Sequence, residues 1–281
     1  MAVGCQTTVI YHYVAGLTGL EDIVHLTYTL VGGATAVIDY AGLRILVDPT
    51  FDPPQTFDHD GIALVKTQPP AIEASEIGAV DLVLITHDHH VDHLDESGKR
   101  LASDAPMVVT TTDGASRLGG GVKGLADFES MQVSLPDGGE LTITGLPAQH
   151  GPEPLCQAMG QVLGFLLEAP DAPRVYFTGD NYSLDVSKKI ATRIAPVDVV
   201  VMYGGGARFA EVIDGEMITM PNEGMLEVTR LVGAKRVLPC HTEGWGHFTE
   251  DTDCLRAAFE ADGLGELFTT VRAGETVTVS V

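Results

Sequence analysis

Four of the ten histidines of this chain fall within one seven-residue window, His87 to His93, which also holds two aspartates. Neutral imidazole and carboxylate are the usual protein ligands of zinc, iron and manganese. A single histidine would more often be a buried structural residue or part of a solvated loop. Four histidines and two aspartates in seven residues favour a metal site over that interpretation.

The window directly follows residues 81–86, a short apolar run without helical period. Such a run predicts a buried β-strand. The imidazoles and carboxylates therefore leave the C-terminal end of a strand together, on a loop. Open α/β sheets bind their ligands at that edge.

Three further residues of ligand type, His150, Asp180 and His241, lie at the ends of other predicted strands. Each alone has an ordinary explanation: His150 as a turn residue, Asp180 as a turn or cap residue, and His241 as a buried, hydrogen-bonded histidine. Four strand ends together carry enough ligands for two metal ions. Asp180 can supply the bridging carboxylate that a metal pair needs.

Two predicted hairpins organise these strands. The first pairs residues 35–40 with 43–48, and the second pairs 164–168 with 174–180. Each ends in an aspartate, Asp48 or Asp180, which suggests an internally duplicated β framework. Further predicted elements are strands over 141–146, 197–203 and 237–241, with Cys240 facing the core, and helices over 94–103 (begun by Asp92), 220–231 and 253–261.

Strands that alternate with helices predict the α/β class. Residues 1–25 lack a clear period and are interpreted as an N-terminal extension, a candidate strand or contact for a homo-oligomer. No linker, charge block or low-complexity run divides the remainder. We therefore predict a single domain over 26–281.

The charge balance bears on the partners of the chain. Sixteen basic residues against 39 acidic residues give a net charge of −23, which repels nucleic acid and anionic membrane and leaves a small molecule as the expected substrate. No stretch approaches the roughly 20 apolar residues of a membrane span. Four cysteines without CxxC pairing and the lack of a secretory signal predict a cytoplasmic protein.

The assembled pattern resembles the metallo-β-lactamase-fold hydrolases. It comprises Thr86-His-Asp-His-His-Val-Asp-His-Leu-Asp95, Gln149-His-Gly151, Gly179-Asp180 and Pro239-Cys-His241. Residues 43–51 and 241–248 are more similar to the branch that contains ascorbate-phosphate lactonases and N-acyl-phosphatidylethanolamine phospholipase D. The resemblance runs from about Thr27 to the C-terminus. It implies a four-layer αβ/βα sandwich, in agreement with the duplicated hairpins.

The sequence departs from the family motif, His-x-His-x-Asp-His, by one extra residue. Counting forward from Thr86 selects His87 and His89, whereas counting back from Asp92-His93 selects Asp88 and His90. A bulged loop could instead use His87 with His90. The sequence leaves open whether His89 or His90 is the metal ligand.

The resemblance implies a role for each motif position. His87, one of His89 and His90, and His150 would hold one divalent metal; Asp92, His93 and His241 would hold a second, with Asp180 bridging. Zinc is favoured, with manganese and iron as alternatives. The pair would generate a metal-bound hydroxide, and Asp92 would orient it and carry a proton. Candidates for substrate binding or proton donation, with ordinary loop packing as the alternative, are Tyr182, Glu243, Trp245 and His247.

The expected activity is hydrolysis of a small lactone or ester. The alternatives are a phosphodiesterase, and an iron-dependent oxidoreductase or dioxygenase on the same fold. The strong negative charge disfavours a polyanionic substrate. Diiron relatives that pass electrons carry a glutamate in the motif and an attached flavin domain, and this sequence shows neither. A scaffold with a decayed site is disfavoured by the full ligand set.

Overall fold

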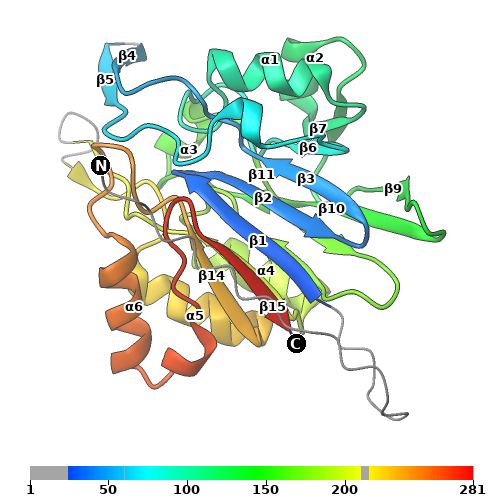
Figure 1. Ribbon diagram of the computed structural model, residues 1–281. Helices are drawn as coiled ribbons and strands as arrows, with labels where there is room; N and C mark the ends of the chain where they lie inside the picture. Colours follow the sequence, from blue (N-terminus) through cyan, green and yellow to red (C-terminus); the bar gives the residue numbers. More distant parts are fainter. Residues whose placement is uncertain (1–24, 60, 210–214, 281) are drawn as a thin grey trace, which may run out of the picture.

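The computed structural model describes residues 25–59, 61–209 and 215–280. Two mixed β-sheets pack face to face (Figure 1). The first has the order β15 (Thr276–Ser280), β1 (His25–Gly32), β2 (Thr35–Tyr40), β3 (Leu43–Val47), β6 (Leu82–Leu84), β7 (Val108–Thr111) and β8 (Lys123–Leu125). The second has the order β14 (Arg236–Cys240), β13 (Val199–Tyr203), β12 (Val175–Phe177), β11 (Val162–Glu168), β10 (Glu140–Ala148) and β9 (Ser130–Ser134).

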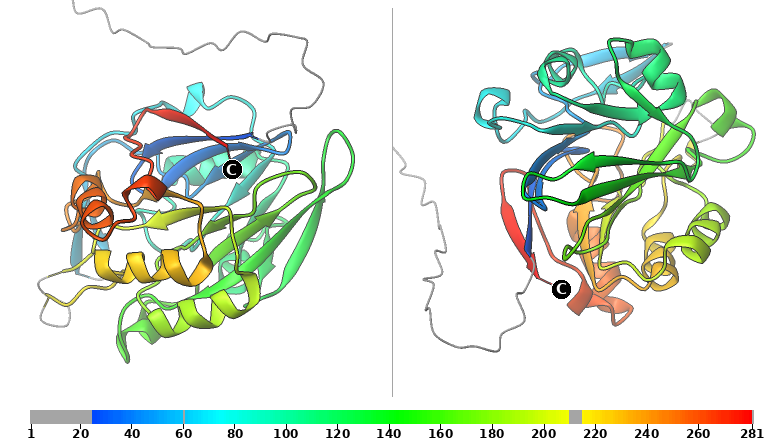
Figure 2. Two further views of the ribbon diagram at one scale, coloured as in Figure 1. Left: turned by 90° about the horizontal axis from the view of Figure 1, so that it is seen from below. Right: turned by 90° about the vertical axis from the view of Figure 1, so that its right-hand side faces the viewer.

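Helices cover the outer faces of both sheets, and Figure 2 shows the resulting layers. On the first sheet lie α1 (Glu96–Asp104) and α2 (Thr112–Leu118); on the second lie α4 (Leu184–Ile194), α5 (Asn222–Val232) and α6 (Thr252–Ala261). The connections contain the hairpin β4 (Thr56–His59) and β5 (Ile62–Val65), the short α3 (Leu155–Ala158), and 3₁₀ turns at Ala74–Glu76 and Gly265–Leu267. This is the predicted four-layer αβ/βα sandwich. No helix in the described part of the chain is long and apolar enough to cross a bilayer.

The main core lies between the two sheets. Strand side chains alternate between the two faces of a sheet, so each strand sends one set of apolar residues inward. Tyr28, Ile38 and Ile45 of the first sheet meet Phe165 and Phe177 of the second, and all are fully buried. Cys240 belongs to this core, as predicted. Burial of these residues fixes how the sheets face each other and hence where their edges meet.

Parallel pairing explains why the predicted ligands gather. Strands β3, β6 and β7 run parallel in the first sheet, as do β12, β13 and β14 in the second. The loops that follow them therefore emerge at one edge. Hydrogen bonds from Leu163 N to Thr86 O (3.0 Å) and from His241 N to Gly33 O (2.8 Å) join the two sheets there.

The two predicted hairpins are confirmed, but the start of the first helix is wrong. Tyr40 pairs with Leu43 in the first hairpin, and Phe165 pairs with Phe177 in the second. Helix α1 is capped by Asp95, whose side chain accepts a hydrogen bond from Gly98 N, and not by Asp92. Because His93 N and Leu94 N donate to His90 O, the chain makes a tight turn before the helix begins.

A buried ion pair between Lys66 and Asp95 stabilises the region where α1 begins. Asp95 accepts hydrogen bonds from Gly98 N (2.8 Å) and Asp52 N (2.6 Å), and its carboxylate lies 3.4 Å from Lys66 Nζ. Both side chains are almost completely buried. Burial lowers the pKa of the Lys66 ammonium, and the charge of Asp95 opposes that shift. Lys66 directly follows β5, so the pair anchors the β4–β5 hairpin to the start of α1.

Replacing Asp95 by alanine should therefore destabilise the metal-free protein by about 3–5 kcal/mol, because Lys66 would be left buried without its partner. Urea unfolding of the metal-free protein measures the loss. The control is Asp251→Ala, which removes an exposed cap of α6 and should cost only about 1 kcal/mol. The double variant Lys66→Met, Asp95→Asn should recover much of the loss. Equal losses from Asp95→Ala and Asp251→Ala would contradict a role for the buried charge.

Candidate metal centre

Loops from four strand ends bring seven buried histidine and aspartate side chains to one place. The loop after β6 supplies four of them, and the loops after β10, β12 and β14 supply one each. The seven are His87, His90, Asp92, His93, His150, Asp180 and His241. All seven were predicted as ligand candidates from the sequence.

Three histidines form a first group. His87 Nε2 lies 2.9 Å from His90 Nδ1, and the His150 ring is 5.2 Å from the His90 ring. One ring nitrogen from each lies within 4.8 Å of those of the other two. His150 Nδ1 is 2.9 Å from the carbonyl oxygen of Ile218, which must accept a hydrogen bond from it. The other nitrogen of His150, Nε2, is thereby free to bind a metal.

A second group adjoins the first through Asp180. His93 Nε2 lies 3.2 Å from His241 Nε2 and 3.2 Å from Asp180 Oδ2, and His150 Nε2 lies 3.4 Å from the same oxygen. Asp92 Oδ2 lies 3.5 Å from His241 Nε2. The Asp180 carboxylate thus stands between the two groups.

His89 takes a different direction from His90. Its Nε2 lies 2.7 Å from the carbonyl oxygen of Met159 and its Nδ1 lies 3.4 Å from Arg117 Nη2. The extra residue in the motif is absorbed by the turn at His90, which places His87 and His90 three residues apart on one side. Of the alternatives that the sequence leaves open, the structure brings His87 and His90 together.

Electrostatics suits cation binding. Burial, reinforced by neighbouring histidines, lowers the pKa of His87 and of His90, so both imidazoles are neutral at pH 7. Burial alone would raise the pKa of Asp92 and of Asp180, but the adjacent histidines outweigh it and lower both. The carboxylates are therefore ionised. Burial opposes protonation of His93, yet Asp180 and the other nearby carboxylates outweigh burial and raise its pKa.

Three polar atoms in or beside the two groups are left without a hydrogen bond by the described residues. Asp92 Oδ1, Asp180 Oδ1 and His247 Nδ1 are buried and make no hydrogen bond to any described residue. A buried polar group without a partner costs about 1–3 kcal/mol. Imidazole nitrogens that face each other at 2.9 Å and 3.2 Å also need a proton or a cation between them. Neutral imidazoles and ionised carboxylates form the donor set that divalent transition metals prefer. These residues fit metal ions.

Asp48 orients part of this set. Its carboxylate accepts hydrogen bonds from Thr86 N (2.7 Å), Thr86 Oγ1 (2.9 Å) and Tyr203 Oη (2.9 Å), and lies 3.1 Å from His93 Nδ1. Thr86 Oγ1 lies 3.0 Å from His87 Nδ1. With both Nδ1 atoms so engaged, His87 and His93 present Nε2 to the centre. A carboxylate behind a ligating histidine fixes its tautomer and raises its basicity.

Sequence analysis did not select Asp48 as a site residue. A signal was present, because Asp48 ends the first hairpin as Asp180 ends the second. The contact with His93 spans 45 residues and connects different strands, so the local pattern could not reveal it.

A cavity of about 360 Å³ opens onto the centre. One wall consists of polar side chains: His89, His90, Asp92, His150, Asp180 and His247. The remaining lining side chains are apolar and form the apolar wall: Ile62, Leu64, Leu155, Ala158, Met159, Ala207, Phe209 and Ile218. None of the described residues that line it is lysine or arginine.

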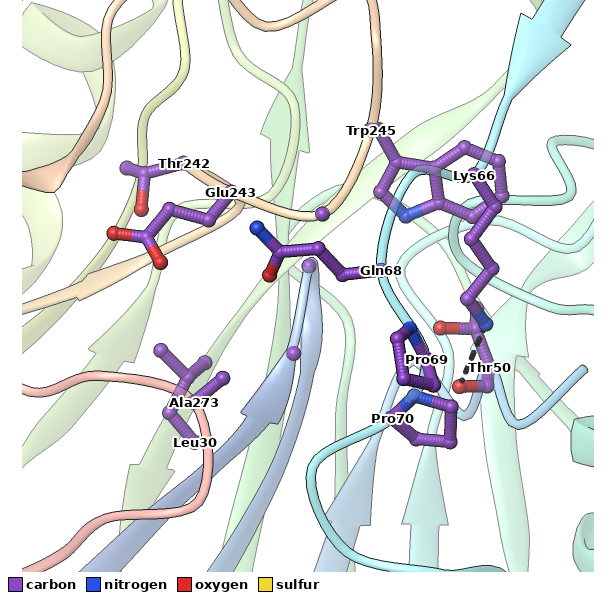
Figure 3. A pocket seen from close by; sticks show the side chains of 13 residues that line it. Leu30, Thr50, Lys66, Gln68, Pro69, Pro70, Thr242, Glu243, Trp245 and Ala273 are labelled. Carbon is purple, nitrogen blue, oxygen red and sulfur yellow. Dashed lines mark hydrogen bonds between the residues drawn. The ribbon is translucent and has the colours of Figure 1, made fainter. Parts of the chain in front are cut away.

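Of the four candidates for substrate binding, His247 lies at this cavity, with Nε2 3.3 Å from Asp92 Oδ2. Glu243 and Trp245 line a different pocket, which Figure 3 shows beside Lys66 and Gln68. That pocket, at about 10 Å³, has room for about one water molecule. Glu243 pairs with Arg272 at 3.1 Å, and Lys66 Nζ stands 5.6 Å from the Trp245 ring centre. Tyr182 is not among the residues that line either pocket.

Asp48→Asn should weaken metal binding about 10- to 100-fold, because the neutral amide no longer holds His93 as a carboxylate does. Competition with a chromophoric chelator measures the affinity. Asp39→Asn is the control: it alters a half-exposed carboxylate on the same sheet that binds Arg44. Unchanged affinity in Asp48→Asn would show that the contact does not tune the centre.

A family model described as a β-lactamase superfamily domain matches residues 43–242. A UPF0173 metal-dependent hydrolase of Pyrobaculum aerophilum is 27% identical, over 84% of this chain and 93% of the relative. The N-acyl-phosphatidylethanolamine-hydrolyzing phospholipase D 1 of Caenorhabditis elegans is 25% identical, over 88% of this chain and 74% of the relative.

A solved structure supports the same fold. The crystal structure of isothiocyanate hydrolase from Delia radicum gut bacteria superposes with a TM-score of 0.76 at 23% identity, over 91% of this chain and 100% of that one. The family match covers most of the chain and includes each strand end that carries a predicted ligand. The chain therefore belongs to the β-lactamase superfamily and is a metal-dependent hydrolase with the metallo-β-lactamase fold.

Proposed function

We propose that this protein hydrolyses a small, uncharged lactone or ester at a centre of two divalent metal ions. The observation that carries the proposal is the mixed lining of the cavity. The carboxylates of Asp92 and Asp180 and four imidazoles line it together with apolar side chains. Since the described lining contains no lysine or arginine, only the metal ions would offer counter-charge to a phosphate or to another polyanion, which favours an uncharged substrate.

Two ligand sets are supported by the distances. His87, His90 and His150 would hold the first metal. Asp92, His93 and His241 would hold the second, with Asp180 shared. Three or four nitrogen and oxygen ligands for each ion favour zinc, with manganese and iron as alternatives. When bound, such a pair lowers the pKa of a shared water and polarises the carbonyl group under attack.

Asp92 and His247 would transfer the proton that the attacking water releases. The Asp92 carboxylate is ionised and lines the cavity, and its Oδ1 makes no hydrogen bond to a described residue. It can therefore accept a proton from the attacking water. His247 Nε2 lies 3.3 Å from Asp92 Oδ2, and its ring stacks on Phe209 with centroids 4.9 Å apart. This pair can pass the proton on toward the leaving oxygen.

The apolar wall would bind the organic part of the substrate. Ile62, Leu155 and Phe209 come from separate segments and belong to this apolar wall. Burying an alkyl group there contributes about 0.8 kcal/mol for each methylene. The relative from Caenorhabditis elegans, named as a phospholipase D, keeps phosphodiester cleavage as a second candidate. The absence of lysine and arginine from the described lining ranks it below ester or lactone cleavage.

Protein purified without added metal should contain between one and two transition-metal ions per chain. Asp180→Ala should lower that number and abolish turnover, because the shared ligand is lost. Elemental analysis measures the content. Asp185→Ala, which alters an exposed carboxylate at the start of α4, should change neither. Full activity in metal-free protein would overturn the proposal.

A panel of neutral lactones and esters should be hydrolysed in preference to bis(p-nitrophenyl) phosphate. The rate should rise with pH through about 7, the range of zinc-bound water. Burial lowers the pKa of His87, His90 and His150, so these ligands are already neutral there and do not cause the rise. Asp92→Asn should flatten the profile. Oxygen consumption coupled to substrate loss, with no oxygen from water in the product, would indicate an oxidoreductase instead.

A further inference from the structure

We infer that His89, the extra residue of the motif, is a positioning residue that holds the apolar wall of the substrate cavity in place. Through that wall it would set the preference for substrates with a longer alkyl group. The inference rests on the proposed function for its substrate class. Its structural part, that a hydrogen bond from His89 holds residues 154–160 in place, does not depend on the proposed function.

Both ring nitrogens of His89 are engaged away from the metal ligands. Nε2 lies 2.7 Å from Met159 O, and because a carbonyl can only accept, Nε2 carries the hydrogen and donates. Arg117 Nη2 lies 3.4 Å from Nδ1 and can only donate to it. A histidine with one nitrogen protonated and the other facing a guanidinium has no lone pair directed at a metal. His89 is thereby free for another task.

The residue before His89 is held in place by an ion pair with Arg117. Asp88, the residue before His89, is buried and accepts two hydrogen bonds from Arg117 of α2, at 2.9 Å to Nε and 2.5 Å to Nη2. This two-point pairing fixes the guanidinium in one plane. The same Nη2 atom reaches His89. Helix α2 therefore holds the His89 ring from one side while Met159 holds it from the other.

The segment that His89 holds has little support of its own. Helix α3 is a single turn without a side-chain cap, and its residues are at most half-buried. Its described backbone hydrogen bonds are local, such as Met159 N to Leu155 O and Cys156 N to Pro152 O. Yet Leu155, Ala158 and Met159 all line the cavity. The bond from His89 ties this turn to the loop that carries the metal ligands.

Gly160 shows how closely the segment after α3 approaches the ring of His89. Its φ is +73°, and a Cβ at this position would lie 2.8 Å from His89 Nε2. A methyl group there would displace the imidazole, which is the movable end of a side chain, and break its bond to Met159. Glycine is therefore required both by the backbone conformation and by the contact with His89.

Two replacements of His89 separate the hydrogen bond from the side-chain volume. His89→Phe keeps a ring and removes the donor, whereas His89→Gln keeps an amide donor at a similar reach. His90→Ala serves as the contrast that removes a proposed ligand. Each protein is loaded with zinc, and three quantities are measured: bound zinc, hydrogen exchange of residues 154–160, and the Kd values of acetohydroxamic and octanohydroxamic acid by calorimetry.

We expect His89→Phe to keep its zinc, to exchange faster over 154–160, and to bind octanohydroxamic acid about 10-fold more weakly, with little change for acetohydroxamic acid. A selective loss for the long chain separates a change in the apolar wall from general damage. His89→Gln should restore both slow exchange and the preference for the long chain. Gly160→Ala should reproduce the behaviour of His89→Phe without altering the histidine.

Loss of zinc in His89→Phe, as in His90→Ala, would overturn the inference and make His89 a ligand. Unchanged exchange, or an equal loss for both hydroxamic acids, would also overturn it. These readouts do not require turnover. A wild-type protein that binds octanohydroxamic acid preferentially but cleaves no ester or lactone would sink the proposed function while leaving the role of His89 intact.

Discussion

The arrangement of the site depends on the hydrogen bonds that the carboxylate of Asp48 accepts. This carboxylate is completely buried and accepts hydrogen bonds from Thr86, just after β6 of the first sheet, and from Tyr203 of β13 in the second sheet. It also faces His93 Nδ1 at 3.1 Å. A buried carboxylate needs hydrogen bonds, an opposite charge or a metal ion to offset the loss of water, and Asp48 has the hydrogen bonds. Satisfying Asp48 thus fixes the relative position of the two sheet edges and the orientation of a ligand histidine at once.

Around Asp48, the site concentrates charge that the fold alone cannot balance. Asp92 and Asp180 are ionised and buried, and each keeps one oxygen that makes no hydrogen bond to a described residue. The neighbouring His87 and His90 are held neutral by burial and by one another. Carboxylates in excess over cationic groups at a buried place require a cation, and the sheets supply the rigid frame for it.

The fold and the clustering of the candidate ligand residues could be predicted because their signals are local. A predicted strand followed by His or Asp can be recognised within a few residues of sequence, as at His150 and His241. The choice between His89 and His90 could not be made, since it depends on the turn in which His90 O accepts from His93 N. Glu243 and Trp245 are candidates for substrate binding only because they follow His241 closely in sequence. His241 has φ +58°, so the chain turns there and carries the next residues toward another pocket.

The residues that would do the chemistry and those that would select the substrate differ in the same way. The first are recognised in local sequence, whereas the second depend on contacts between distant segments. Residues that would do the chemistry sit at the ends of core strands, where packing fixes both register and direction. The apolar wall comes from the β4–β5 hairpin, the single turn α3 and the stretch around Phe209, which lie outside the two main sheets. Such segments vary without disturbing the core. A sequence motif can therefore identify the reaction type, while the substrate is set by contacts, such as that of His89 with Met159, that join segments 70 residues apart.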